Sequence, residues 1–222
     1  MKEIKYQSRS VTSNQSGIHE NLELIVSKHL KSKYRKPIQD HNREAFATIQ
    51  KAIAESPAKS VILDSCCGTG ASSIYFAQKN PNSLVVGVDQ SYKRLNKKDE
   101  ERFIPQNCLL LRANCEDIWR LCVDNKIEFS QHFILYPNPW PKSEHLKRRW
   151  HGHPVFSYLP KLSPYTELRS NWPVYLEEFS LSWQLATNID SQLNEMAIVE
   201  PITLFEKKYS QSGQKLYQLV LQ

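Results

Sequence analysis

The sequence has no apolar run near the roughly 20 residues that span a bilayer, so no membrane segment is expected. Its first ten residues, MKEIKYQSRS, lack the apolar core of a secretory signal. It contains five cysteines, an odd number, and no two of them have the CxxC spacing of a zinc site. These absences argue against a disulfide framework and against a metal site. They predict a cytoplasmic protein with reduced thiols.

The composition is that of a globular chain. The 222 residues fit one domain, since a single core stops growing only near roughly 250 to 300 residues. Hydrophobic residues make up 40% and charged residues 23% of the chain. The 29 basic residues exceed the 23 acidic ones, which gives a net charge of +6 and a pI near 9.0. This balance favours a polyanionic partner.

The chain divides into an arm and one domain. Residues 1–20 are polar and without periodicity, and we expect them to form an arm that orders only on binding. Residues 21–222 form the domain, with helices at 21–57 and an α/β core at 58–222. The first helix, from residue 21, leads into a basic run that ends before Pro37: Lys28, Lys31, Lys33, Arg35 and Lys36. This run is either a solvated helix end or a phosphate-contacting patch.

The core opens as a nucleotide-binding βαβ unit. A strand at 60–65 leads into a turn with Gly68 and Gly70, a helix follows at 71–79, and a second strand at 84–89 ends in Asp89. Glycine lets the backbone approach a ligand closely, and an acid at the second strand end accepts ribose hydroxyls. A nicotinamide-dependent dehydrogenase is disfavoured, because its fingerprint needs a third glycine where Ser73 stands.

Polar residues follow four successive strands. Further strands are predicted at 108–112, 132–136, 165–170 and 216–221, with a helix at about 172–187 that Asn171 caps. The fold class is therefore α/β, a mostly parallel, doubly wound, Rossmann-like sheet with helices on both faces. The four strand-end residues should converge on one crevice at the carboxyl edge: Asp64, Asp89, Asn114 and Asn138. The alternative for each Asn is a simple turn-forming role.

The stretch after the fourth strand, PNPWPKSEHLKRR, combines three prolines with a dense basic tail. Proline restricts the residue before it, so Asn138 and Trp140 are expected to be extended. The stretch is either a solvated connection or a rigid wall of the crevice.

These motifs, together with Ser170-Asn171-Trp172, Tyr175 and Thr203 to Lys207, resemble the tRNA (guanine-N7)-methyltransferase family in order and spacing. The resemblance covers about residues 60–220. It implies a class I methyltransferase fold, S-adenosylmethionine as cofactor, and a guanine of tRNA as acceptor.

The resemblance also implies roles for individual residues. Gly68 and Gly70 would pass under the methionine part of the donor, and Asp64 would hold its amino group. Asp89 would bind the ribose, and Asn114 with Cys115 would border the adenine. Asn138 occupies the family's catalytic or guanine-holding position. The substrate contacts implied are Lys142, His145, Lys147, Arg148, Arg149, Asn171, Thr203 and Glu206.

The sequence departs from the family at three positions that bear on chemistry. Asn138 and Asn171 stand where the family has aspartates, and an amide brings a donor and no charge. Cys66 stands at a glycine position, which is tolerated only if the backbone there does not need a positive φ. Three readings stay open. They are an N7 methyltransferase, a methyltransferase with a different acceptor base, and a catalytically impaired homologue that binds S-adenosylmethionine and RNA.

Overall fold

A mostly parallel sheet forms the centre of the molecule. The computed structural model describes residues 8–96 and 103–222, and the strands there follow the order β3-β2-β1-β4-β5-β7-β6. The first five strands are mutually parallel, and β7 is antiparallel to both of its neighbours. The strands are β1 (Ser60–Ser65), β2 (Ser83–Asp89), β3 (Cys108–Arg112), β4 (Gln131–Leu135), β5 (Thr166–Ser170), β6 (Gln192–Met196) and β7 (Leu216–Leu221). The predicted fold class is confirmed.

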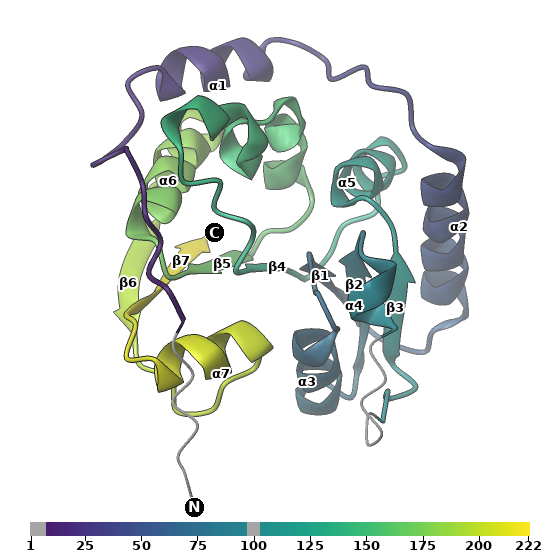
Figure 1. Ribbon diagram of the computed structural model, residues 1–222. Coiled ribbons are helices and arrows are strands. Elements are labelled where there is room, and N and C mark those ends of the chain that lie inside the picture. Colours follow the sequence, from purple (N-terminus) through teal and green to yellow (C-terminus); the bar gives the residue numbers. More distant parts are fainter. Residues whose placement is uncertain (1–7, 97–102) are drawn as a thin grey trace, which may run out of the picture.

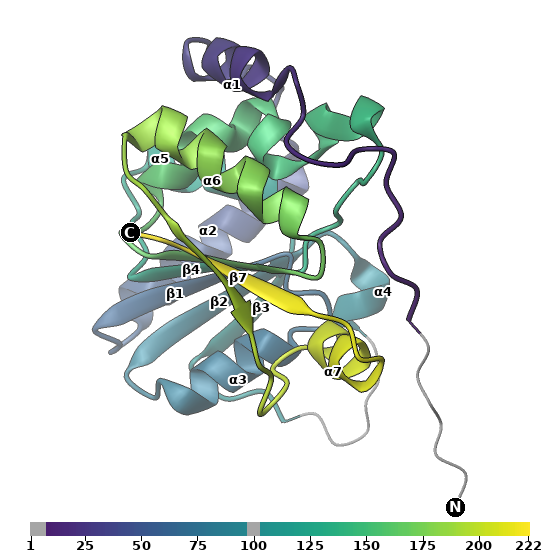
Figure 2. The same cartoon turned by 90° about the vertical axis from the view of Figure 1, so that its left-hand side faces the viewer.

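Helices cover both faces of this sheet (Figures 1 and 2). The α-helices are α1 (Leu22–Leu30), α2 (Asp40–Glu55), α3 (Ala71–Lys79), α4 (Tyr92–Leu95), α5 (Cys115–Asp124), α6 (Pro173–Thr187) and α7 (Leu204–Gln211). Three 3-10 helices follow β4: η1 (Ser143–Arg148), η2 (Trp150–Gly152) and η3 (Pro154–Lys161). Figure 2 shows α5 and α6 above the sheet and α3 and α7 below it. The two apolar cores divide in the same way, since residues of α1, α2, α5 and α6 share one cluster and those of α3 the other.

Strand β2 is buried along its whole length, as its run of valines leads one to expect. Helix α3 packs closely against it at Gly87. A Cβ atom there would lie 2.3 Å from the Ser73 hydroxyl and 2.6 Å from a methyl group of Leu110. The missing side chain therefore lets the start of α3 approach the sheet, which fixes the loop between β1 and α3.

The N-terminal arm is attached to the domain in its described part. Residue 8 lies against the turn after α7, because the Gln214 side chain donates to the Ser8 carbonyl (3.0 Å) and hydroxyl (2.6 Å). Asn14 and Ser143 exchange two hydrogen bonds (3.2 and 2.9 Å). Figure 1 shows the arm running from α1 past α6 towards α7. The described part of the arm is thus attached to the domain at Ser8 and Asn14, and residues 1–7 of the predicted arm lie outside the described residues.

Most predicted elements occur within one or two residues of their expected bounds. Helix α1 ends at Leu30, however, and the basic run continues as an irregular segment to α2. Strand β6 was not predicted, because its sequence, QLNEM, is polar and mostly exposed and is held by pairing with β7. No helix in the two described ranges is long and apolar enough to traverse a bilayer.

Candidate active site at the carboxyl edge

The loop after β1 bends through three residues with positive φ. The values are +62° at Cys66, +61° at Gly68 and +77° at Gly70. Backbone bonds from Cys67 N to the Val88 carbonyl (3.1 Å) and from Gly70 N to the Cys67 carbonyl (2.8 Å) hold this shape. The condition stated for a residue other than glycine at position 66 is not met, because Cys66 has a positive φ. A side chain in this region costs about 1 kcal/mol relative to glycine, so the loop is strained at Cys66.

Asp64 lies behind this loop and joins β1 to the start of α3. Its carboxylate is fully buried, and Oδ2 accepts hydrogen bonds from the hydroxyls of Ser72 and Ser73, both at 2.6 Å. Burial raises the pKa of Asp64 to about 6, against the opposing effect of the two hydroxyls. Oδ1 has no hydrogen-bond partner in the structure. Of this carboxylate, Oδ1 is therefore the acceptor left for the amino group that the resemblance assigns to it.

Asp89 closes β2 and faces the same loop. The Gly68 backbone N–H donates to Oδ2 (3.0 Å) and the Ser91 N–H to Oδ1 (2.8 Å), while the Arg94 guanidinium lies 3.7 Å from Oδ2. A carboxylate has about four lone-pair positions, so acceptor capacity remains for a ligand. A Cβ atom at Gly68 would have no heavy atom within 4 Å. Open space and an oriented carboxylate therefore adjoin the loop.

The residues after β3 lie next to the loop after β1. The side chain of Asn42 from α2 accepts the Asn114 backbone N–H (3.0 Å) and donates to Asp117 (2.7 Å), which fixes the start of α5. Asn114 is half-buried and makes no side-chain cap, so its amide stays available. Sγ of Cys115 lies 3.8 Å from Sγ of Cys66. The structure thus brings the first three predicted strand ends together.

The loop after β4 is bent at Trp140, which is not extended as predicted. Trp140 has a φ of +44° and Tyr136 a φ of +52°, although each precedes a proline, which disfavours helical conformations. Asn138 is exposed, and its Oδ1 accepts the Trp140 backbone N–H at 3.3 Å. Its NH2 group is therefore the part that faces outward. Such strained positions concentrate at functional sites.

The basic tail of this loop splits into two parts. Lys142, Lys147 and Arg148 are exposed, and the Arg148 guanidinium stacks on Trp140, 4.8 Å from the ring centre. His145 makes an edge contact with the same ring at 5.5 Å. These four residues are the exposed or partly exposed part of the tail. Arg149 does not belong to it, because its side chain is fully buried.

Arg149 belongs to a buried polar network centred on Glu178 of α6. Oε2 of Glu178 accepts from Arg149 and from His151 Nε2 (2.8 Å), and Oε1 accepts from the Gln15 side chain and the His19 backbone N–H (2.9 Å). Burial lowers the pKa of His151, against the opposing hydrogen bond and charge of Glu178, and Nδ1 of the ring has no hydrogen-bond partner among the described residues. Arg149 therefore holds the arm and the loop together and is not placed to reach a polyanion.

Asn171 takes part in a chain of hydrogen bonds to the arm. Its Nδ2 donates to Oε1 of Gln214 (2.8 Å), and the Gln214 amide donates onward to Ser8. The predicted helix cap at Asn171 is wrong. Helix α6 begins after Trp172 without a side-chain cap, and the Ser170 hydroxyl accepts the Trp172 N–H at 3.0 Å. The free group of Asn171 is its carbonyl oxygen.

Thr203 and Glu206 start α7. The Thr203 hydroxyl accepts the Glu206 N–H (3.0 Å), and the buried Glu206 carboxylate accepts from the Ile202 N–H (2.7 Å), Arg169 (2.7 Å) and the Tyr136 hydroxyl (3.1 Å). This arrangement resembles a capping box. The Tyr136 contact also links α7 to the end of β4, so Thr203 and Glu206 stabilise the start of the loop after β4.

One lysine from each basic run of the sequence acts on the same histidine, His29 of α1. Burial lowers the pKa of His29, and the nearby charges of Lys147 and Lys28 lower it further. One lysine comes from α1 and the other from the tail after β4. The sequence suggested a phosphate-contacting patch for each run. More than a hundred residues separate the two runs, so the sequence could not predict that both act on His29.

Comparison with known proteins places the chain in a family. A sequence model of the family described as "Putative methyltransferase" matches residues 58–219. The chain belongs to this methyltransferase family. A tRNA (guanine-N(7)-)-methyltransferase of Mycoplasma genitalium is 34% identical over 113 residues, which are 49% of this chain and 52% of that protein. One from Mycobacterium ulcerans is 26% identical over 176 residues, 72% of this chain and 62% of that protein. The chain thus spans about half to three fifths of the length of these curated relatives.

A solved structure shares the fold of this chain. It is a variant of the 16S rRNA (adenine(1408)-N(1))-methyltransferase of Catenulisporales acidiphilia with its cosubstrate SAM. The TM-score is 0.52 at 19% identity, over 83% of this chain and 92% of that one. At this identity the likeness concerns the fold alone.

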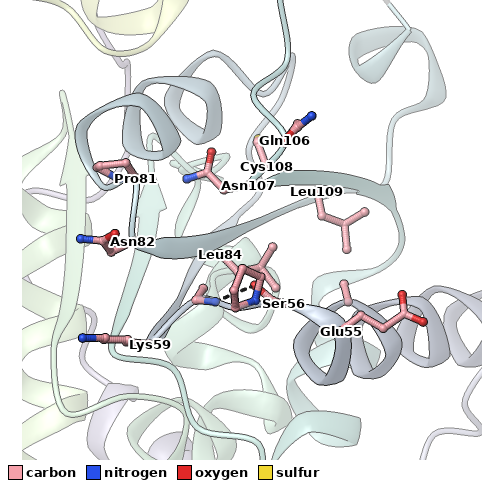
Figure 3. Close-up of a pocket in the computed structure, with 13 residues that line it drawn as sticks. Glu55, Ser56, Lys59, Pro81, Asn82, Leu84, Gln106, Asn107, Cys108 and Leu109 are labelled. Atoms are coloured by element: carbon pink, nitrogen blue, oxygen red, sulfur yellow. Dashed lines mark hydrogen bonds between the residues drawn. The ribbon is translucent and has the colours of Figure 1, made fainter.

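The chain also has a pocket at the opposite edge of the sheet (Figure 3). It lies where β1, β2 and β3 begin, between the end of α2 and the turn at Pro81 and Asn82. Ligands of doubly wound sheets bind outside the carboxyl ends of the strands, whereas this pocket adjoins their amino ends. We therefore assign the candidate site to the edge formed by Gly68, Asp89 and Asn114.

Proposed function

We propose that this protein is an S-adenosylmethionine-dependent tRNA methyltransferase, with a guanine as the default acceptor and N7 as the default atom. The observation that carries the proposal is the Gly68 N–H held on the Asp89 carboxylate beside open space. Family membership and the tRNA substrates named for both relatives support it. The solved relative by fold that contains SAM supports the choice of donor.

The residues at the carboxyl edge fit this donor. Asp89 would accept the ribose hydroxyls with its remaining lone pairs, and Gly68 would let the chain pass close to the methionine part. Asn114 and Cys115 would border the adenine, and Oδ1 of Asp64 would accept from the amino group. When bound, S-adenosylmethionine supplies an electrophilic methyl group on a positively charged sulfur. The loop after β1 would orient that methyl group towards the loop after β4.

The acceptor would contact the face formed by Asn138, Trp140 and the exposed basic tail. Lys147 belongs to this tail and Lys28 to the run that begins in α1, and the charges of both act on His29, so the two basic runs would neutralise phosphates of one RNA. Guanine N7 carries a lone pair, so the protein has to orient the base and tolerate the developing positive charge. Asn138 would offer an amide donor, and Asn171 a carbonyl acceptor, to the base edge.

A second candidate is a homologue that binds donor and RNA with impaired catalysis. It is favoured by the missing carboxylates, because neither the Asn138 nor the Asn171 amide can offset a cationic ring.

The five cysteines within the described residues are all thiols, which is consistent with a reducing compartment, and we propose the cytoplasm as the location of the protein.

The test is incubation of the protein with bulk tRNA and methyl-labelled S-adenosylmethionine, followed by nucleoside analysis. N7-methylguanosine is expected, and Asp89→Asn should abolish the label by weakening the donor site. Label in a different nucleoside would show that the acceptor is a base other than guanine. Donor binding without any label would favour the impaired homologue, and absence of donor binding would refute the proposal.

A further inference from the structure

Two thiols face each other at the carboxyl edge of the sheet, where we propose that the donor binds. Sγ of Cys66 and Sγ of Cys115 lie 3.8 Å apart, and both cysteines are free. They come from different strand ends, β1 and β3, so their approach is a product of the fold. A disulfide has an S–S length of about 2.0 Å, which a small movement of the loop would reach.

The two thiols differ in access. Cys66 is partly exposed, whereas Cys115 is buried and its pKa lies well above the ordinary value because of its hydrogen bond with Cys66 and its burial. The Cys66 side chain is therefore the one that an external reagent meets first. It also sits at a φ of +62°, which glycine would adopt without strain.

We propose that Cys66 and Cys115 form a reversible disulfide by exchange with a low-molecular-weight disulfide, and that this bond closes the donor site. The first half of the proposal concerns the thiols alone. The second half rests on the proposed function, since it supposes that the donor binds between these strand ends.

The exchange takes two steps. The Cys66 thiolate attacks one sulfur of a small disulfide such as oxidised glutathione, forms a mixed disulfide and releases one thiolate. Cys115 then loses its proton to that thiolate and attacks the Cys66 sulfur, displacing the second thiol. Two cysteine thiols are oxidised and one small disulfide is reduced to two thiols. The second step is favoured by the 3.8 Å separation, which gives Cys115 a high local concentration.

The bond would deform the donor edge. Drawing Cys66 towards Cys115 displaces a loop whose Gly68 N–H orients the Asp89 carboxylate. A cross-link would also occupy the side where Asn114 and Cys115 are proposed to border the adenine. We expect donor affinity to fall by about tenfold or more on oxidation and to return on reduction.

The experiment uses the full chain treated with excess oxidised glutathione and then digested without reduction. The expected product is a peptide pair linked through Cys66 and Cys115, together with the loss of two of the five titratable thiols. Cys122→Ala is the matched control on the same helix, because Cys122 is fully buried and burial raises its pKa to about 12. It should give the same linked pair as the unchanged protein.

Calorimetric titration with S-adenosylhomocysteine then compares oxidised and reduced protein. Cys66→Gly keeps the backbone conformation, and Cys115→Ser keeps a side chain of similar size. In each the ratio of oxidised to reduced affinity should be one. A product that stops at a glutathione adduct on Cys66, or a pair linked through other cysteines, would overturn the disulfide site.

A linked pair with unchanged affinity would overturn the closure of the donor site. Reduced protein that binds no donor at all would instead refute the proposed function, while the linked peptide would still decide the disulfide.

Discussion

Replacing Glu178 with Gln should destabilise the fold strongly, because no orientation of an amide suits its surroundings. Each carboxylate oxygen of Glu178 accepts two hydrogen bonds, from Arg149 and His151 on one side and from Gln15 and His19 on the other. Whichever way Gln is turned, its NH2 group faces two donors. The Arg149 guanidinium would also stay buried without a counter-charge.

The magnitude follows from two independent routes. Removing one partner of a buried ion pair typically costs about 3 to 5 kcal/mol. Burial alone would raise the pKa of Glu178, but the hydrogen bond and charge of His151 and Arg149 outweigh it and lower the pKa from 4.5 to about 2. That shift corresponds to about 3 kcal/mol of stability when the carboxyl is ionised.

The sign of the pH dependence can be worked out from this shift. A lowered pKa in the folded state stabilises the protein fully above pH 4.5, and this stabilisation is lost as the pH falls from there towards 2. The difference in unfolding free energy between the natural protein and Glu178→Gln should therefore be largest at neutral pH. It should shrink progressively below about pH 4.5.

Urea unfolding at several pH values measures this difference, with Glu177→Gln as the control at the neighbouring, partly exposed position. Adding Arg149→Met to Glu178→Gln should recover part of the loss, because it removes the uncompensated cation. Hydrogen exchange at residues 15–19 should rise in the single variant. A loss below about 1 kcal/mol at neutral pH, or one that does not change with pH, would refute this account of the network.

Two further predictions concern the RNA face and the arm. Lys28→Glu combined with Lys147→Glu should weaken tRNA binding and lower the slope of log affinity against log salt by about two, as filter binding at several salt concentrations would measure. Lys51→Glu combined with Lys59→Glu, at two exposed positions, is the control for net charge. Asn171→Asp should lower the free energy of unfolding by about 1 kcal/mol and speed hydrogen exchange at residue 8, because a carboxylate would face Oε1 of Gln214. Unchanged exchange at residue 8 would contradict the chain of hydrogen bonds from Asn171 through Gln214 to Ser8.

The sequence was sufficient for the sheet, and for placing Gly68 and Asp89 together at its carboxyl edge, because both depend on local patterns. Apolar strands, glycine turns and an acid at a strand end recur at fixed spacing, so Gly68 and Asp89 could be paired in advance. Contacts between distant segments could not. Arg149 stands in a row of cations that looks solvated, and only the approach of Glu178 and Gln15 makes it a buried residue. Strand β6 was missed because β7, and not its own pattern, specifies it.

The two amides that replace the family's aspartates differ in the hydrogen bonds that they make with the rest of the fold. Asn138 forms a turn with its own loop, and an aspartate could accept the same Trp140 N–H. Asn171 is different, because Ser8 orients the Gln214 amide and leaves an oxygen facing Asn171, where only a donor is tolerated. Its substitution therefore has a structural cause in the attachment of the arm. The loss of a carboxylate at position 138 has no such cause in the described contacts, so position 138 is where a change of acceptor chemistry would originate.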